Sequence, residues 1–199
     1  FGVFGLGFFV YAVGGTIDTL FFPEALPSPT YGTGKVNNGV SYNGSTQYSR
    51  MANAFSMGDA SFSFWLKTTS TAQRRVVSEY DTASGSGWAF IFEINRTANK
   101  MTFALVHYGV GGSTEVTSSA TINDGTWHHI VGLRTGNTYK IYVDNTLSGT
   151  TGGGSTTNTD APITVAGEVY GSTLYSPLPG SLDELGIWIK ALSDTEISN

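Results

Sequence analysis

Alternation of apolar and polar residues along the chain predicts many short β-strands and very little helix. Over residues 60–67 the side chains of Phe62, Phe64 and Leu66 fall on one face of a strand and Trp65 on the other. Similar patterns predict further strands over residues 75–80, 87–94, 100–107, 126–135, 138–144, 162–168 and 180–189. About ten to twelve strands separated by turn residues predict an all-β chain, folded as a two-sheet antiparallel β-sandwich.

Two local signals predict how particular elements begin and end. Gly136 and Asn137 stand between two β-rich runs, and this pair supplies the positive φ angles of a tight hairpin turn. Ser193 precedes Glu196 by three residues, which is the capping-box spacing that starts a helix. The sequence therefore predicts a hairpin over residues 126–144 and a short helix near the end of the chain.

Composition excludes several classes of function. The net charge is −5, and Lys and Arg are scattered rather than gathered in a basic stripe, which argues against a nucleic-acid partner. Cysteine is absent, so disulfides, thiolate zinc sites and cysteine nucleophiles are ruled out. Charged residues make up only 13 % and aromatic residues also 13 %, a balance typical of a folded β-protein and not of a disordered chain.

The first segment differs from the rest of the chain. Residues 1–17 carry no charge and include five glycines, which suit a membrane-spanning helix poorly. We expect a buried strand, or an arm packed on another chain, rather than a membrane span. The side chains that would make such an assembly contact are those of Phe1, Phe4, Leu6, Phe8 and Phe9. Because the sequence opens on Phe rather than Met, we also expect a fragment or processed form of a longer product.

Four motifs, found in order, carry a family resemblance. They are GKVNNGVSYNGSTQY at 34–48, FSFWLK at 62–67, DGTWHHIV with YKIYVDN between 124 and 145, and GSLDELGIWI with ALS between 180 and 193. Residues 34–199 thereby resemble the laminin-G-like domains of the concanavalin A-like lectin/glucanase superfamily. The resemblance implies a jelly-roll sandwich over 34–199, preceded by an apolar arm and proline-containing loop over 1–33, as one domain overall.

The resemblance implies two kinds of function, because one fold hosts many roles. Similar sequences occur in phage tail, fibre and decoration proteins and in bacterial surface proteins, which implies an extracellular or virion-surface location. One expectation is a non-catalytic recognition or adhesion module that binds a surface glycan. The alternative is a purely structural virion decoration or fibre subunit, whose partners are other subunits or further copies of itself. The apolar segment 1–17 favours this alternative.

Carbohydrate recognition needs exposed aromatic rings for the apolar faces of sugars and polar groups for their hydroxyls. Aromatic residues expected in loops or at strand ends are the candidates: Tyr108, Tyr170, His107, Tyr175 and Trp88. The first two are preferred, because exposed tyrosines on glycine-rich loops are hard to explain by packing. Asn95, Arg96 and Asn99, between strands, would add polar contacts. Each ring considered alone also fits an ordinary surface or core position.

A structural calcium ion is the only cofactor that the resemblance suggests. Asp183 matches the acidic position of the closing motif that ligates calcium in some relatives. In the alternative interpretation, its carboxylate accepts hydrogen bonds from a loop backbone. His128 and His129 are adjacent on a strand and point to opposite faces, so they are expected to pack, one of them beside Trp127, rather than share a metal.

No catalytic residues are predicted. Glycoside hydrolysis needs two carboxylates that flank the scissile bond. The nearest acid pairs are Glu79 with Asp81, which stands at the start of a turn, and Asp183 with Glu184, which point to opposite faces of a strand. No Ser-His-Asp arrangement is selected by the sequence either. We therefore expect a protein that is not an enzyme.

Overall fold

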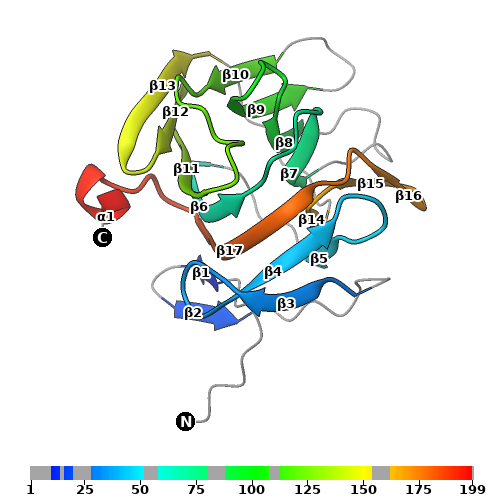
Figure 1. The fold of residues 1–199 in the computed structure, drawn as a ribbon. Coiled ribbons are helices and arrows are strands. Elements are labelled where there is room, and N and C mark those ends of the chain that lie inside the picture. The colour runs from blue at the N-terminus through cyan, green and yellow to red at the C-terminus, as the bar shows by residue number, and fades with distance from the viewer. Residues whose placement is uncertain are drawn as a thin grey trace.

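The computed structural model describes residues 10–13, 16–19, 28–51, 58–79, 88–107, 113–153 and 162–198. Within them the chain is a two-layer antiparallel β-sandwich with one short helix (Figure 1). Both the all-β class and the sandwich architecture predicted from the sequence are confirmed. Residues 1–9 lie outside the described part, so the assembly contact expected at Phe1, Phe4, Leu6, Phe8 and Phe9 stays a prediction.

The larger sheet has nine strands. They are β1 (Val10–Val13), β2 (Thr16–Thr19), β3 (Thr30–Thr33), β4 (Asn38–Asn43), β6 (Ala60–Lys67), β11 (Trp127–Thr135), β12 (Thr138–Val143), β13 (Thr146–Gly152) and β17 (Pro179–Trp188). The main order is β13-β12-β11-β6-β17-β1-β2. Strand β17 also pairs with β4 through residues 179–182, whereas residues 186–188 pair in parallel with β1. A β-bulge between Asp183 and Gly186 separates these two pairings.

The second sheet has six strands in the order β10-β9-β8-β7-β14-β5. They are β5 (Ser49–Met51), β7 (Arg74–Glu79), β8 (Trp88–Ile94), β9 (Met101–His107), β10 (Ser113–Thr117) and β14 (Ile163–Val165). A separate two-stranded hairpin, β15 (Glu168–Tyr170) with β16 (Thr173–Tyr175), projects from the edge of the sandwich beyond β7 and β14 (Figure 1).

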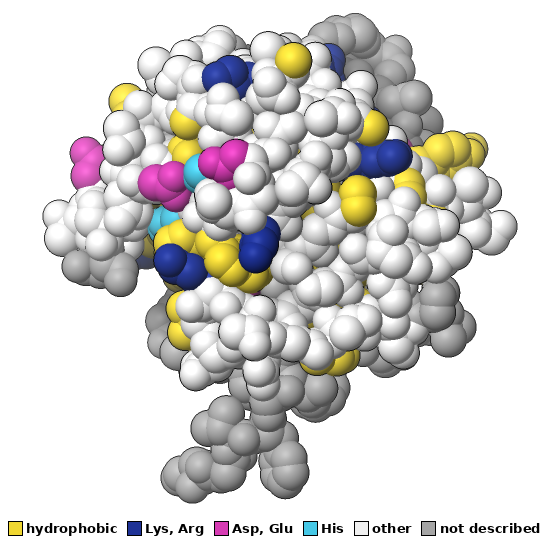
Figure 2. Space-filling view, in the orientation of Figure 1, with side chains coloured by type: hydrophobic (Ala, Val, Ile, Leu, Met, Phe, Trp, Pro, Cys, Tyr) yellow, Lys and Arg dark blue, Asp and Glu magenta, His cyan; other side chains and the backbone are white. Residues whose placement is uncertain are grey.

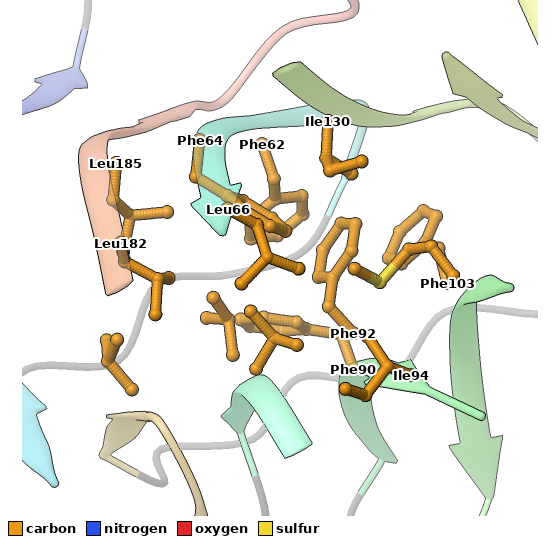
Figure 3. Packing of buried hydrophobic residues seen from close by; sticks show 14 of the residues in the cluster. Phe62, Phe64, Leu66, Phe90, Phe92, Ile94, Phe103, Ile130, Leu182 and Leu185 are labelled. Carbon is orange, nitrogen blue, oxygen red and sulfur yellow. The ribbon is translucent and has the colours of Figure 1, made fainter. Parts of the chain in front are cut away.

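The core lies between the two sheets and is built from aromatic rings (Figure 3). Phe62 and Phe64 of β6 face the second sheet, as the alternation in residues 60–67 predicts. Phe92 of β8 stacks on Phe103 of β9, with ring centroids 4.5 Å apart and planes 11° apart. It also meets Phe64 edge-on at 5.3 Å. Such contacts add to the free energy gained by burying each ring.

Glycine at position 132 makes room for this cluster. Gly132 of β11 lies opposite Phe62, and a Cβ there would clash with the ring of Phe92 and lie 3.2 Å from Cδ1 of Phe103. The φ angle of Gly132 is not in the left-handed region, so the need for glycine at this position is steric. A methyl group would force the two sheets apart at their most aromatic point.

The short helix α1 (Asp194–Ser198) begins as the capping-box spacing predicts. The backbone N–H of Ser193 donates to Oε2 of Glu196 at 2.9 Å, and the N–H of Glu196 faces Oγ of Ser193 at 3.4 Å. Ile197 packs with Val131 and Leu133 on the outer face of the larger sheet. No helix among the described residues is long and apolar enough to cross a membrane.

The structure differs from the sequence prediction over residues 162–168. The expected single strand is divided, because β14 ends at Val165 and Ala166 takes a φ of 65°. A new strand, β15, starts at Glu168. Consequently Tyr170 and Tyr175 lie on the paired strands of a hairpin, and their expected placement in loops is wrong.

Candidate functional site

The β15–β16 hairpin presents two tyrosines on one face. Gly171 in its turn has a φ of 59°, which suits glycine in a two-residue hairpin turn. In the register of the hairpin Glu168 pairs with Tyr175, and Tyr170 pairs with Thr173. Because side chains alternate along a strand, these four residues share one face. The Tyr170 and Tyr175 predicted from sequence are therefore brought together.

Both tyrosine rings are open to solvent. Tyr170 is 51 % exposed and Tyr175 is 46 % exposed, and their ring centroids lie 6.5 Å apart with planes inclined by 38°. In Figure 2 hydrophobic side chains gather at the edge of the molecule where Figure 1 places this hairpin, with Lys or Arg atoms beside them. We call Tyr170 and Tyr175 the tyrosine pair.

The opposite face of the hairpin fixes it to the sandwich. Val169 is buried, and Leu174 lies against Gly167 so closely that a Cβ there would be 2.5 Å from its Cδ1. The backbone N–H of Arg75 donates to the carbonyl of Ser176, just after β16, at 3.0 Å. The tyrosine pair thus stands on an anchored support.

Charged side chains of alternating sign extend from the hairpin across the second sheet. Nε of Arg75 donates to Oε2 of Glu168 at 3.0 Å, and its Nη1 contacts Oε2 of Glu93. Nη1 of Arg96 donates to Oε1 of Glu93 at 2.9 Å, and its Nη2 lies 2.6 Å from Oε1 of Glu115. We call these five residues the charge network.

The charge network has one fully buried member, to which both of its cations bind. The side chain of Glu93 is fully buried, so its charge is tolerable only because Arg75 and Arg96 both bind it. Nε2 of Gln73 adds a hydrogen bond of 2.7 Å to Oε2. Glu93 holds Arg75, and Arg75 in turn holds the carboxylate of Glu168, which lies on the same face as the tyrosine pair.

The other predicted aromatic residues lie elsewhere. Trp88 pairs with His107 across β8 and β9. Trp88 stands five residues before Glu93, about 17 Å along an extended strand, whereas Glu93 pairs with Arg75 beside the hairpin. The side chains of Trp88 and His107, and Tyr108 as a whole, lie outside the described part, so their roles as ligand contacts stay predictions.

The surroundings of Asp183 do not fit a calcium ion. Oδ2 accepts a hydrogen bond from the backbone N–H of Val36 at 2.8 Å, and Oδ1 accepts one from Glu184 at 2.9 Å. A Cβ at Gly34 would clash with Oδ2, so the loop backbone closes on the carboxylate. Calcium takes six to eight oxygen ligands, and the described residues contain no group of three acidic or histidine side chains able to hold a metal. These contacts agree with the alternative interpretation, in which the carboxylate of Asp183 accepts hydrogen bonds from a loop backbone.

On the outer face of the larger sheet, His129 stacks on Trp65. Their ring centroids lie 5.0 Å apart, and Nζ of Lys35 lies 4.7 Å from the centroid of Trp65. Nε2 of His129 is 2.7 Å from Oγ of Ser63, and its Nδ1 is 2.9 Å from Oδ1 of Asn145. The partner expected for the packing histidine was Trp127, but the sheet register pairs His129 with Trp65.

His128 points the other way and lies between two acids. Its Nδ1 is 2.8 Å from Oδ2 of Asp144, and its Nε2 is 3.2 Å from Oδ1 of Asp124. In the view of Figure 2, a histidine side chain lies between acidic side chains on the surface. Hydrogen bonds from the side chain and backbone of Thr126, and then from His128, lower the pKa of Asp124 to about 2. Both histidines therefore hold the β11–β12 hairpin in place.

Comparison with known proteins identifies the family. A family model described as the concanavalin A-like lectin/glucanases superfamily, of the laminin G type, matches residues 42–198. The chain belongs to this family. A sequence comparison with curated proteins gave no significant match.

Solved structures confirm the fold at low sequence identity. Domain 4 of the extracellular arabinanase AbnA from Geobacillus stearothermophilus, in complex with arabinotriose, superposes with a TM-score of 0.68 at 16 % identity, covering 85 % of this chain and 79 % of that one. The CBM40 of the Ruminococcus gnavus IT-sialidase, bound to α2,3 sialyllactose, gives 0.65 and 16 %, covering 80 % and 94 %. A pentraxin from Limulus polyphemus gives 0.62 and 14 %, covering 79 % and 78 %.

The acidic residues of the charge network are not among the site residues predicted from the sequence. Glu93 is the single charged residue in the apolar strand β8, and an acid in such a run signals a buried ion pair. Arg96 lies only three residues after Glu93, but Arg75 reaches Glu93 from β7 and Glu168 reaches Arg75 from the hairpin, so only the fold brings these two partners together.

Proposed function

We propose that this chain is a non-catalytic carbohydrate-binding module and that the tyrosine pair is its sugar platform. The observation that carries the proposal is the exposure of two neighbouring rings, Tyr170 and Tyr175, on an anchored hairpin. Large exposed aromatic side chains are costly to leave in water and are typical of binding surfaces. The carbohydrate-binding names among the structural neighbours support this choice of ligand class.

The hairpin is suited to binding because it is ordered before any ligand arrives. Leu174 against Gly167 and Arg75 bound to Ser176 fix the base of the hairpin, so little conformational entropy would be lost on binding. Glu168 shares the face of the rings and accepts a hydrogen bond at Oε2, and a carboxylate in this position would accept hydrogen bonds from sugar hydroxyls.

The contacts among Ser63, His129 and Asn145 resemble part of a catalytic site, but their surroundings support the proposal of a module without catalysis. These three side chains form a hydrogen-bonded chain like that of a serine nucleophile and its base. Acyl transfer also needs backbone donors for an oxyanion. Ser63 lies within β6, opposite Val131 of β11 and Gly186 of β17, so it stands inside a paired sheet rather than beside a helix N-terminus or a loop that could supply such donors.

We further propose that the module acts outside the cell or on a virion surface, as the family resemblance of its sequence implies. The alternative, a structural decoration or fibre subunit that contacts other subunits or its own copies, depends on residues 1–17. Assembly with a partner that is lost on deleting 1–9, and that tolerates loss of both tyrosines, would favour that alternative.

A glycan-array assay on purified protein tests the proposal, run with calcium and again with EDTA. Selective binding in both conditions that is lost in the Tyr170→Ala/Tyr175→Ala variant would support a carbohydrate module with this platform. Absence of binding to every printed glycan, or binding that the variant retains in full, would reject it.

A further inference from the structure

We infer that the tyrosine pair, if it acts as the proposed sugar platform, selects neutral oligosaccharides of at least two sugar residues and rejects sugars that carry a carboxylate. The observation behind this inference is the charge network, in which both guanidinium groups are already bound to carboxylates and Glu168 shares the face of the rings. The inference thus names the ligand class of the proposed site.

Recognition of an acidic sugar needs a cation with open donors. A guanidinium binds a carboxylate best through two parallel N–H bonds. Arg75 already bridges Glu168 and Glu93, and Arg96 already bridges Glu93 and Glu115. The positive charge of each cation is therefore already balanced by carboxylates before a ligand lies on the tyrosine pair.

The network also repels a ligand carboxylate. It contains three acids and two bases, and its end nearest the rings is the carboxylate of Glu168. Only 12 % of the Glu168 side chain is exposed, so water screens it poorly. A second carboxylate placed on the same face would meet like charge, whereas a hydroxyl would meet an acceptor.

The ring geometry indicates the length of the ligand. Centroids 6.5 Å apart with planes inclined by 38° form two platforms rather than one continuous surface. One sugar ring covers one tyrosine, so a second, linked sugar is needed to cover the other. Because the two contacts are then joined, the affinity should rise steeply from a monosaccharide to a disaccharide.

Matched probes test the charge selection on the full chain. An array would carry neutral oligosaccharides, including arabinotriose and lactose, and would place α2,3-sialyllactose and oligogalacturonides beside their methyl esters. Where an acidic glycan and its ester bind at all, we expect the ester to bind about tenfold more tightly, since it lacks the negative charge that Glu168 repels. Equal binding, or tighter binding of the free acid, would overturn the inference.

Glu168→Gln tests the cause of the selection, and Glu184→Gln is its control. Both remove one negative charge, but Glu184 lies on the bulge of β17, outside the charge network. We expect Glu168→Gln to weaken binding of the neutral probe, because it replaces a charged acceptor of sugar hydroxyls, and to narrow the ester-to-acid ratio to about threefold or less. Glu184→Gln should keep the full ratio. A ratio that both variants leave unchanged would contradict the role of Glu168.

The outcomes separate this inference from the proposed function. Binding that prefers the free acid, yet is lost in Tyr170→Ala/Tyr175→Ala, rejects the inference and leaves the carbohydrate module standing. Equal affinity for a neutral monosaccharide and its disaccharide rejects the two-ring mode alone. Binding that survives loss of both tyrosines, or no binding to any probe, rejects the proposed function and the inference together.

Discussion

Oδ2 of Asp183 accepts a hydrogen bond of 2.8 Å from the backbone N–H of Val36, 147 positions earlier in the chain. Its Oδ1 accepts a second one from Glu184. The bond joins the bulge of β17 to the turn between β3 and β4, where Gly34 donates to the carbonyl of Asn37. A buried carboxylate thereby fixes the place where the larger sheet divides.

Asp183→Ala should destabilise the protein by about 2–3 kcal/mol, because it removes a buried carboxylate that accepts hydrogen bonds from two backbone N–H groups. Urea denaturation measures the change, and Glu184→Gln on the same bulge should cost much less. EDTA should leave the melting temperature of the wild type unchanged. A melting temperature that falls in EDTA, and recovers with calcium, would contradict the assignment of Asp183 to the loop.

Gly132→Ala should destabilise the protein by about 1–3 kcal/mol, because its Cβ would clash with the ring of Phe92 in a close-packed core. Gly32→Ala in β3 is the matched control, since no atom lies within 4 Å of its added Cβ. Thermal and urea unfolding of both variants would measure the difference. Equal stability of the two variants would contradict this prediction, because it would mean that the ring of Phe92 can move aside for the added methyl group at no cost.

The sequence predicts the core better than the surface, for a physical reason. Phe62 and Phe64 follow a period of two, and burial on one face is enough to produce that pattern. The hairpin of Tyr170 and Tyr175 is too short for such a period, and its position depends on the bend at Ala166. Tyr175 could be selected as an exposed aromatic residue, but its place beside Tyr170 depends on the hairpin register.

Contacts within one turn could be predicted from the sequence, whereas contacts between strands could not. The capping box of Ser193 and Glu196 could be predicted, because both partners lie in one turn. The stack of His129 on Trp65 could not, although Trp65 was expected on the face opposite Phe62 and Phe64, and His128 and His129 on opposite faces of their strand. Strand register decides that contact, and sequence alternation defines faces without defining partners.

Arg75→Met should destabilise the protein by about 2–3 kcal/mol, because it removes one of two cations that bind the buried Glu93 and also releases Glu168. Lys190→Met, which breaks the exposed ion pair with Glu196, should have a much smaller effect on the denaturation midpoint. Similar changes of the denaturation midpoint in the two variants would contradict the predicted contribution of the charge network to stability.

The pKa of Asp124 gives a pH prediction with a definite sign. Because hydrogen bonds from Thr126 lower this pKa from 3.8 to about 2, the folded state favours the charged carboxylate. The stability that Asp124 contributes is present above about pH 4 and is lost as the pH falls toward 2. Carboxyl NMR titration should find Asp124 near 2 in the wild type and higher in Thr126→Val. Titration near 3.8 in the wild type would refute the assigned contacts.

The most direct test of the account is a binding titration of the best glycan from the array against matched tyrosine variants. Tyr170→Ala and Tyr175→Ala should each weaken binding about tenfold or more, because each removes one ring of the platform. Tyr31→Ala is the control, since Tyr31 on β3 is similarly exposed, at 48 %, but belongs to another sheet. Equal affinities for all three variants and the wild type would contradict the sugar platform at Tyr170 and Tyr175.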